Sequence, residues 1–205
     1  MVLAVLCMVC AAGSMDGVQG PPGRPPAPPG LSWTDADALT RKLATIESLG
    51  GSLDPRRKPT RLEVTEAELN SYLNLSLASQ IPPGVADLRV RLHADEVEAR
   101  AVVDIDRVRG QVEPAGSWGP FAFFGGSVPV ELRARLTSEG GFGSVRIERA
   151  SIGSMPVPVA VLEQLVASAT KTAANPGGFA LLTPFRLPYS LRRVRIQPGR
   201  VWLDF

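Results

Sequence analysis

The chain of 205 residues has room for one domain of ordinary size with one hydrophobic core. It carries 22 Lys and Arg residues against 20 Asp and Glu residues, which gives a formal net charge of +2. A balance this small gives no support to nucleic acid or an anionic surface as the main partner, and we expect no nucleic acid partner.

An apolar leader opens the chain. Residues 2–12 are small or apolar without a break, and residues 10–12 are suited to cleavage by a signal peptidase. The run is shorter than the roughly 20 residues that a membrane-spanning helix needs. No Lys or Arg precedes it, which is atypical. We predict a signal peptide over residues 1–12 and an exported protein. Both cysteines, Cys7 and Cys10, lie in this segment, so the mature chain would have no disulfide and no thiolate metal site.

Residues 13–31 are rich in Pro and Gly, and residues 20–30 read GPPGRPPAPPG. Such a composition favours an extended or polyproline-like tether. It is either a remnant of the leader or, if the leader is retained, a spacer that reaches from the membrane. The remaining residues, 32–205, form the predicted domain, with its core module over residues 60–205.

Two amphipathic helices are predicted before the first hairpin. Leu39, Leu43 and Ile46 recur at helical spacing, which predicts a helix over residues 34–49 that ends at two glycines. After a short strand over residues 61–64, Thr65 and Glu68 have the spacing of a capping box. This box predicts a helix to about residue 78, with one apolar face formed by Leu69, Tyr72, Leu73 and Leu77.

From residue 85 the apolar period changes from helical to two, which predicts antiparallel hairpins. The alternating segments are residues 88–92 with 97–105, residues 128–136 with 145–147, and residues 194–196 with 201–205. Residues 155–158 open a segment in which Leu162, Leu165, Val166 and Ala169 fit a third helix that ends near residue 172. The fold class is therefore α+β, with a strongly curved antiparallel sheet built from hairpins that wraps one or two amphipathic helices.

Residues suited to catalysis or metal binding are few. His93 is the single histidine and lies at the exposed end of a strand, without a second His or a Cys nearby in sequence. Asp104 and Asp106 fall on the charged face of a strand, where cross-strand ion pairs with Arg100 and Arg107 are the favoured interpretation. We find no nucleophile, phosphate-loop or dinucleotide motif. We predict that the protein is not an enzyme and has no catalytic residue, no metal and no cofactor.

Rows of arginine occupy the outward positions of the predicted strands. They comprise Arg89, Arg91, Arg133, Arg135, Arg193 and Arg195. A basic sheet face can hold nucleic acid or anionic lipid headgroups. Glutamates at Glu96, Glu98 and Glu131 share the face, and no aromatic residues are interleaved, so we favour a mixed-charge, solvated face.

An aromatic segment over residues 118–126 has neither helical nor strand period and contains Trp118, Phe121, Phe123 and Phe124. Its Gly and Pro residues predict a loop. A loop with this many large apolar groups covers the core, lines the mouth of an opening or makes a peripheral contact with a membrane.

The inward positions of the strands carry small or branched apolar residues. A curved sheet with such a face either packs closely on a helix or encloses an elongated apolar cavity. The residues that would line this cavity are Leu69, Tyr72, Leu73, Leu77, Val90, Ala99, Ala101, Val103, Leu132 and Ala134.

The segment over residues 64–73, VTEAELNSYL, resembles the start of the helix in small bacterial exported proteins with a single TULIP-like, tubular lipid-binding module. The order of the later segments is also similar: hairpins, the IGSMPVP motif of residues 152–158, and Leu187, Pro188 and Tyr189 before a closing hairpin. The resemblance covers roughly residues 60–205 and implies a bacterial protein of the periplasm or envelope that binds lipid or another apolar ligand. The tether and first helix are not part of the family pattern, and no lipidation motif surrounds the cysteines.

The sequence therefore predicts an envelope protein that binds or carries a lipid or apolar small molecule between helix and sheet. The alternative is a non-catalytic structural or assembly protein of the envelope with a solid core, whose protein partner is unknown.

Overall fold

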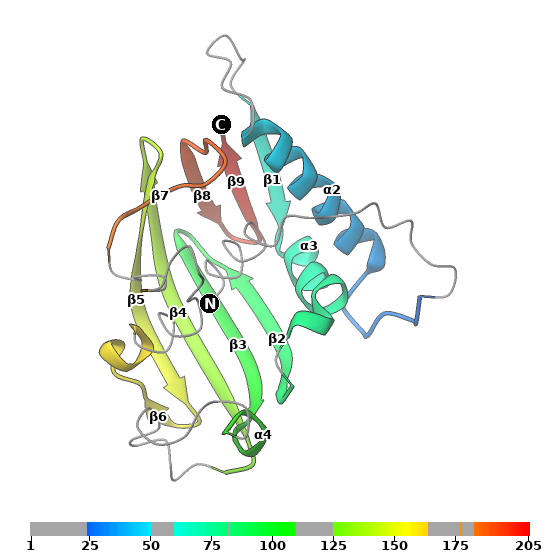
Figure 1. Cartoon of the computed structure of the whole chain (residues 1–205), viewed down its shortest axis with the longest axis vertical. Helices are drawn as coiled ribbons and strands as arrows, with labels where there is room; N and C mark the ends of the chain where they lie inside the picture. Colours follow the sequence, from blue (N-terminus) through cyan, green and yellow to red (C-terminus); the bar gives the residue numbers. More distant parts are fainter. Residues whose placement is uncertain (1–23, 51–59, 82, 110–124, 164–176, 178–182) are drawn as a thin grey trace.

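The computed structural model describes residues 24–50, 60–81, 83–109, 125–163, 177 and 183–205 (Figure 1). The fold is α+β with antiparallel sheets and few helices, as predicted. The predicted signal peptide over residues 1–12 lies outside the described residues. So do the four aromatic residues Trp118, Phe121, Phe123 and Phe124 and the second half of the third helix, whose first turn is helical over residues 159–163.

The larger sheet contains six strands in the order β2, β3, β4, β5 and β6, with β7 paired to β5. All its pairs are antiparallel, and the bounds are β2 Val85–Leu92, β3 Glu96–Asp104, β4 Ser127–Glu139, β5 Phe142–Ile152, β6 Met155–Pro156 and β7 Phe185–Arg186. The predicted hairpins of residues 88–105 and 128–147 are therefore confirmed as neighbours in one sheet. The strand predicted to reach residue 105 ends at Asp104, because Ile105 opens the short helix α4 (Ile105–Arg109).

The C-terminal hairpin belongs to a second sheet, which the sequence did not predict. Strand β9 (Arg200–Asp204) pairs with β8 (Arg193–Gln197) on one side and with β1 (Arg61–Thr65) on the other. The two sheets meet where the hydroxyl of Ser138 on β4 donates to the Val194 carbonyl of β8 and accepts from the Val194 N–H, both at 2.7 Å. This side chain adds to backbone hydrogen bonds at the same boundary, where the Asp95 N–H donates to the Ile196 carbonyl and the Gly199 N–H donates to the Leu92 carbonyl, both at 3.1 Å.

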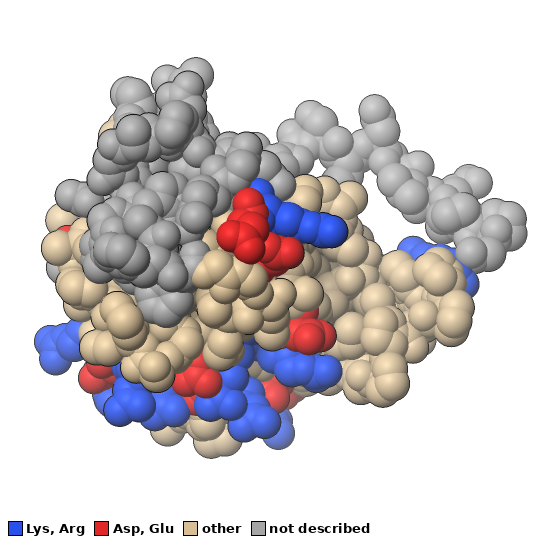
Figure 2. All heavy atoms as spheres, turned by 90° about the horizontal axis from the view of Figure 1, so that it is seen from below, with Lys and Arg blue, Asp and Glu red and all other residues tan. Residues whose placement is uncertain are grey.

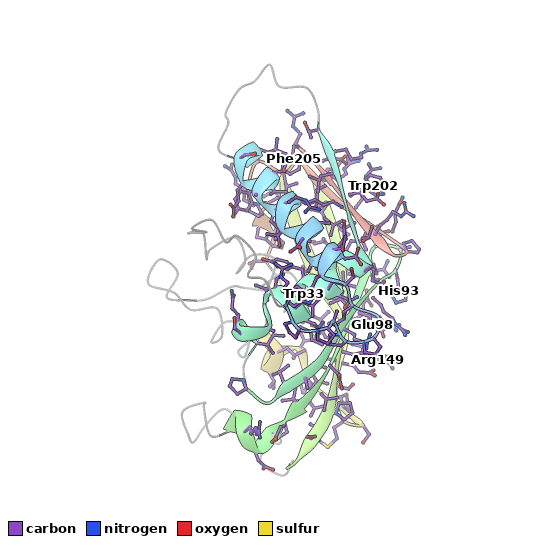
Figure 3. All side chains as sticks on the ribbon, turned by 90° about the vertical axis from the view of Figure 1, so that its right-hand side faces the viewer. Trp33, His93, Glu98, Arg149, Trp202 and Phe205 are labelled. Carbon is purple, nitrogen blue, oxygen red and sulfur yellow. The ribbon has the colours of Figure 1, made fainter. Side chains whose placement is uncertain are left out.

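The helices lie on one side of the two sheets (Figures 1 and 3). Helix α2 (Trp33–Gly50) confirms the first predicted helix to within one residue at each end. Residues 24–31, at the end of the predicted tether, contact the first turns of this helix. Arg24 forms an ion pair with Asp37 at 2.7 Å and lies 4.6 Å from the centroid of the Trp33 ring.

The second predicted helix is shorter than expected. Helix α3 (Glu66–Ser71) begins at the predicted capping box, in which the Thr65 hydroxyl accepts from the Glu68 N–H and the Glu68 carboxylate accepts from the Thr65 N–H. It is followed by a π-helical turn, η1 (Tyr72–Ser76), and a 3₁₀ turn, η2 (Ala78–Gln80). The prediction of one regular helix to residue 78 is therefore wrong. The π-helical turn is wider than an α-helical turn, and it allows the Asn74 side chain to bind the neighbouring edge strand.

That edge strand is β2, and the polar side of α3 and η1 satisfies its backbone. Asn70 accepts from the Val90 N–H at 2.7 Å and donates to the Val90 carbonyl at 2.8 Å. Two further side chains, four residues away on either side, extend the contact: the Asn74 amide donates to the Leu88 carbonyl at 2.7 Å and the Glu66 carboxylate accepts from the Leu92 N–H at 2.8 Å. We call Glu66, Asn70 and Asn74 the edge clamp. It leaves fewer backbone groups of this edge free to pair with another chain.

The main core lies between the helices and the two sheets. It contains the apolar stripe of α2, the apolar residues of α3 and η1, and the inward residues of both sheets. A second, smaller cluster is centred on Ala150 and Val157 and includes Leu132. No described helix is both long and apolar enough to cross a bilayer.

The outer face of the larger sheet, opposite the helices, is charged (Figures 2 and 3). Glu98 lies in the middle of it, with a side chain that is only 7% exposed. The Arg133 guanidinium donates to the Oε2 atom of Glu98 at 2.6 Å. The Nε atom of Arg100 lies 2.8 Å from the Oε1 atom of Glu98, in an ion pair that lacks hydrogen-bond geometry. His93 is half exposed and lies 3.7 Å from the same carboxylate. The hydrogen bond from Arg133 and the charge of Arg100 outweigh the effect of burial, so the pKa of Glu98 is lowered.

This lowered pKa predicts acid sensitivity. Because the unfolded chain takes up the Glu98 proton near the ordinary value of 4.5, the ion pairs stabilise the fold fully above that pH and lose their contribution as the pH falls through the lower folded-state pKa. We expect the urea midpoint to fall below pH 4.5 in the wild type and to fall less steeply in Glu98→Gln. Glu139→Gln, at a side chain that is 88% exposed, is the control. An unchanged slope in Glu98→Gln would contradict this assignment.

Candidate functional site: an apolar cavity between helix α2 and the two sheets

A cavity of about 80 Å³ lies between helix α2, the inward faces of both sheets and the turn before β8. Its lining surface is entirely apolar. The lining residues are Leu39, Leu43, Ile46, Val64, Leu69, Leu92, Val97, Leu136, Pro188, Tyr189, Leu191, Val194, Ile196, Val201 and Leu203. A site with this lining gives a water molecule almost nothing to bind and suits a hydrocarbon group.

Helix α2 forms one wall of the cavity. Leu39, Leu43 and Ile46 lie on one face of the helix, and Leu39 and Ile46 are only 2% and 5% exposed. Few of the described polar contacts tie this helix to the elements beneath it. One is the hydrogen bond at 3.0 Å from the Ser32 N–H, just before the helix, to the Ser71 hydroxyl.

A second contact is the ion pair of Lys42 with Glu68. The Lys42 ammonium lies 2.7 Å from both carboxylate oxygens of Glu68, whose side chain is 11% exposed. Burial alone would raise the pKa of Glu68, but the hydrogen bonds from Lys42 and from the Thr65 N–H outweigh it, and the pKa is lowered. The pair therefore joins the outer edge of the cavity wall to the capping box of α3.

The opposite wall is a turn with an unusual backbone. Tyr189 and Ser190 have φ values of 56° and 59°, in the left-handed region that side chains other than glycine rarely adopt. Hydrogen bonds on either side hold the turn: the Leu187 N–H donates to the Gly141 carbonyl at 2.8 Å, and the Leu191 N–H donates to the Pro188 carbonyl at 3.1 Å. Each such residue costs of order 1–3 kcal/mol, and strain of this kind is frequent at ligand sites.

An open groove of about 710 Å³ lies on the outer side of the same turn. It shares Pro188, Tyr189 and Leu191 with the cavity, so the turn separates the two spaces. Polar and apolar groups both line the groove. Phe142 is 52% exposed there, and the Arg186 guanidinium lies 5.8 Å from the centroid of its ring.

The cavity-lining residues predicted from sequence lie mostly beside this cavity rather than around it. Leu69 is the one member of the predicted set that lines it. The other helical members and the first strand members are buried in the described structure: Tyr72, Leu73, Leu77, Val90, Ala99 and Ala101. The remaining three, Val103, Leu132 and Ala134, are partly buried.

The larger part of the lining comes from segments outside the set of cavity residues predicted from the sequence. Leu39, Leu43 and Ile46 were identified as an apolar stripe, and Val194, Ile196, Val201 and Leu203 as inward strand residues. Their helical and alternating spacings show only that each of them faces inward. That they face one another depends on the pairing of β1 with β9, two segments more than 130 residues apart.

The two aspartates considered as metal ligands, Asp104 and Asp106, make contacts within the fold. Asp104 forms an ion pair with Arg107 at 3.6 Å, and Asp106 accepts from the Gly126 N–H at 2.7 Å. The prediction that Asp106 lies on a strand is wrong, since it falls in α4. Within the described ranges, no group of His, Cys, Asp and Glu side chains is arranged to hold a metal ion.

Comparisons with protein-family models, with curated protein sequences and with solved structures give no match to this chain. The assignment of a function consequently depends on the cavity, the turn and the groove themselves.

Proposed function

We propose that the protein is a non-catalytic carrier of an apolar ligand in the bacterial envelope, and that the ligand is an amphiphile with a single hydrocarbon chain. The observation that carries the proposal is the apolar cavity beneath helix α2. Hydrophobic burial would supply most of the affinity, at about 25 cal/mol per Å² of apolar area removed from water.

The size of the cavity requires an opening step. Its volume of about 80 Å³ is roughly half of the 150 Å³ at which an engineered apolar cavity in another protein binds benzene. A longer chain would enter by displacement of the turn over residues 187–191 and by a shift of α2, which has an apolar contact face and few polar ties to the layer beneath. The polar end of the ligand would then remain in the groove near Arg186. Strong curvature of the sheets around the helices is part of this proposal.

The small volume also favours one alternative, a structural or assembly protein of the envelope with a solid core. In that case the cavity is a packing defect, and the exposed groove beside Phe142 contacts a protein partner.

A cavity-filling variant separates the two functions. Val97 and Val201 line the cavity from different sheets, and the double substitution Val97→Ile with Val201→Ile adds one methyl group from each side. We expect uptake of a fluorescent fatty acid by the wild type and at least tenfold weaker uptake by the double variant, with equal or higher stability. The control is Val102→Ile, which makes the same change on β3 outside the cavity. Uptake that is equal in all three proteins, or absent in the wild type, would support the solid-core alternative.

A further inference from the structure

The outer face of the larger sheet carries more arginine than its ion pairs use. On the central parts of β2 to β5, seven arginines face outward against four glutamates: Arg89, Arg91, Arg100, Arg133, Arg135, Arg146 and Arg149 against Glu96, Glu98, Glu131 and Glu148. This surplus of three on one part of one face exceeds the net charge of +2 of the whole chain. The positive surplus is confined to these central parts, because Asp104 and Glu139 lie on the same face at the ends of β3 and β4.

Ion pairs occupy the middle of this face and leave its two sides free. Arg133 and Arg100 contact Glu98, Arg100 also contacts Glu131, and Arg135 contacts Glu96 and Glu148. Four arginines form no ion pair with any described residue, namely Arg89 and Arg91 on β2 and Arg146 and Arg149 on β5. All four are exposed. We call them the free arginines.

The register places the free arginines in an ordered array. Arg91 pairs with Glu98, Glu98 with Arg133, and Arg133 with Arg149, so one cross-strand row runs Arg, Glu, Arg, Arg over four strands. The ends of this row are about 14 Å apart, at roughly 4.8 Å per strand. Because β2 is an edge strand whose backbone is already held by the edge clamp, Arg89 and Arg91 are not needed to prevent edge pairing.

We propose that this arginine face binds the surface of a membrane that contains anionic phospholipids. Guanidinium groups bind phosphate through two parallel hydrogen bonds, and clusters of four or more basic residues are typical of surfaces that recognise anionic lipids. Trp202 lies on the same side of the molecule, on the outward face of β9, where its indole suits the boundary between lipid and water (Figure 3).

Charge alone would also fit a nucleic acid, but the rest of the face favours lipid. Proteins that bind single strands interleave aromatic side chains with the basic ones to stack bases. The outward positions of the described parts of β2 to β5 carry no aromatic residue except at the Phe142 end of β5, away from the free arginines. The described face likewise presents no helix or loop that could enter a duplex groove.

Vesicle co-sedimentation of the full chain tests the proposal. The vesicles contain either phosphatidylcholine alone or phosphatidylcholine with phosphatidylglycerol. We expect binding to the second kind only, weakened as salt is raised. Arg91→Glu and Arg149→Glu should each weaken it at least fivefold, since one basic residue near an anionic surface contributes about that factor. The control is Arg41→Glu, which makes the same charge change at an exposed position of α2 on the opposite side.

Three results would overturn the proposal: binding that does not depend on the anionic lipid, equal weakening in Arg41→Glu, or binding to a DNA duplex without binding to vesicles. The test is independent of the cavity, because the Val97→Ile, Val201→Ile variant should bind vesicles as the wild type does. Loss of fatty-acid uptake with retained vesicle binding would therefore affect only the proposed carrier function.

Discussion

Replacement of Asn70 by leucine should lower the free energy of unfolding by about 3 kcal/mol and promote self-association. The substitution removes both hydrogen bonds to Val90, which is 1% exposed, and leaves a backbone N–H and a backbone carbonyl buried without partners. Each unsatisfied buried group costs about 1–3 kcal/mol. Displacement of α3 from this edge would relieve both groups, and the exposed edge of β2 can then pair with a second chain. Urea denaturation and size-exclusion chromatography measure the two effects.

Asn70→Asp makes the test more specific, because it keeps the shape of the side chain. The carboxylate can still accept from the Val90 N–H, but it would face the Val90 carbonyl with a second acceptor, so stability should still fall. Gln80→Leu, at an exposed position of η2, serves as the control for a polar-to-apolar change. Asn70→Leu with a urea midpoint equal to that of Gln80→Leu would show that the edge clamp does not stabilise the sheet.

Replacement of Leu39 by alanine should also cost about 3 kcal/mol, and part of that loss should be recovered on adding benzene. Leu39 is 2% exposed and lines the cavity, so its truncation enlarges a space that already exists. The enlarged cavity approaches the size that binds benzene in another protein. A ligand in several-fold excess over its Kd returns about 1 kcal/mol, a rise of about 2–4 °C in Tm for a chain of this size.

The matched variant is Leu73→Ala. Leu73 is equally buried, at 3% exposure, but does not line the cavity, so its truncation opens an isolated void. It should lose a similar free energy of unfolding and gain little from benzene. Equal recovery in both variants, or none in Leu39→Ala, would contradict the placement of the cavity.

The parts of the fold that depend on neighbouring residues were predictable from sequence. The helical spacing of Leu39, Leu43 and Ile46 predicted helix α2, Thr65 and Glu68 predicted the start of α3, and alternation predicted the hairpins of the larger sheet. Each of these signals lies within one turn of helix or one pair of adjoining strands, where local geometry decides the structure.

The parts that depend on distant segments were not predictable. Nothing near Arg61 or Asp204 indicates that β1 pairs with β9 rather than with the larger sheet, and this pairing decides which apolar residues enclose the cavity. The π-helical turn also depends on contact with a segment that is distant in sequence. The Asn70 and Asn74 side chains bind strand β2, and that tertiary contact outweighs the preference of the segment for a regular helix. Of the free arginines, Arg89 and Arg91 belong to the arginine rows identified from the sequence, whereas Arg146 and Arg149 do not. That all four lack ion-pair partners among the described residues follows only from the structure.

The carrier function is tested most directly by native mass spectrometry, with organic extraction, of the full chain expressed with export in a bacterial host. We expect a co-purifying amphiphile at close to one molecule per chain, lost in the Val97→Ile, Val201→Ile variant and retained in Val102→Ile. A ligand-free mass for the wild type, together with no uptake of a fluorescent fatty acid, would contradict the carrier function and favour the solid-core assembly protein.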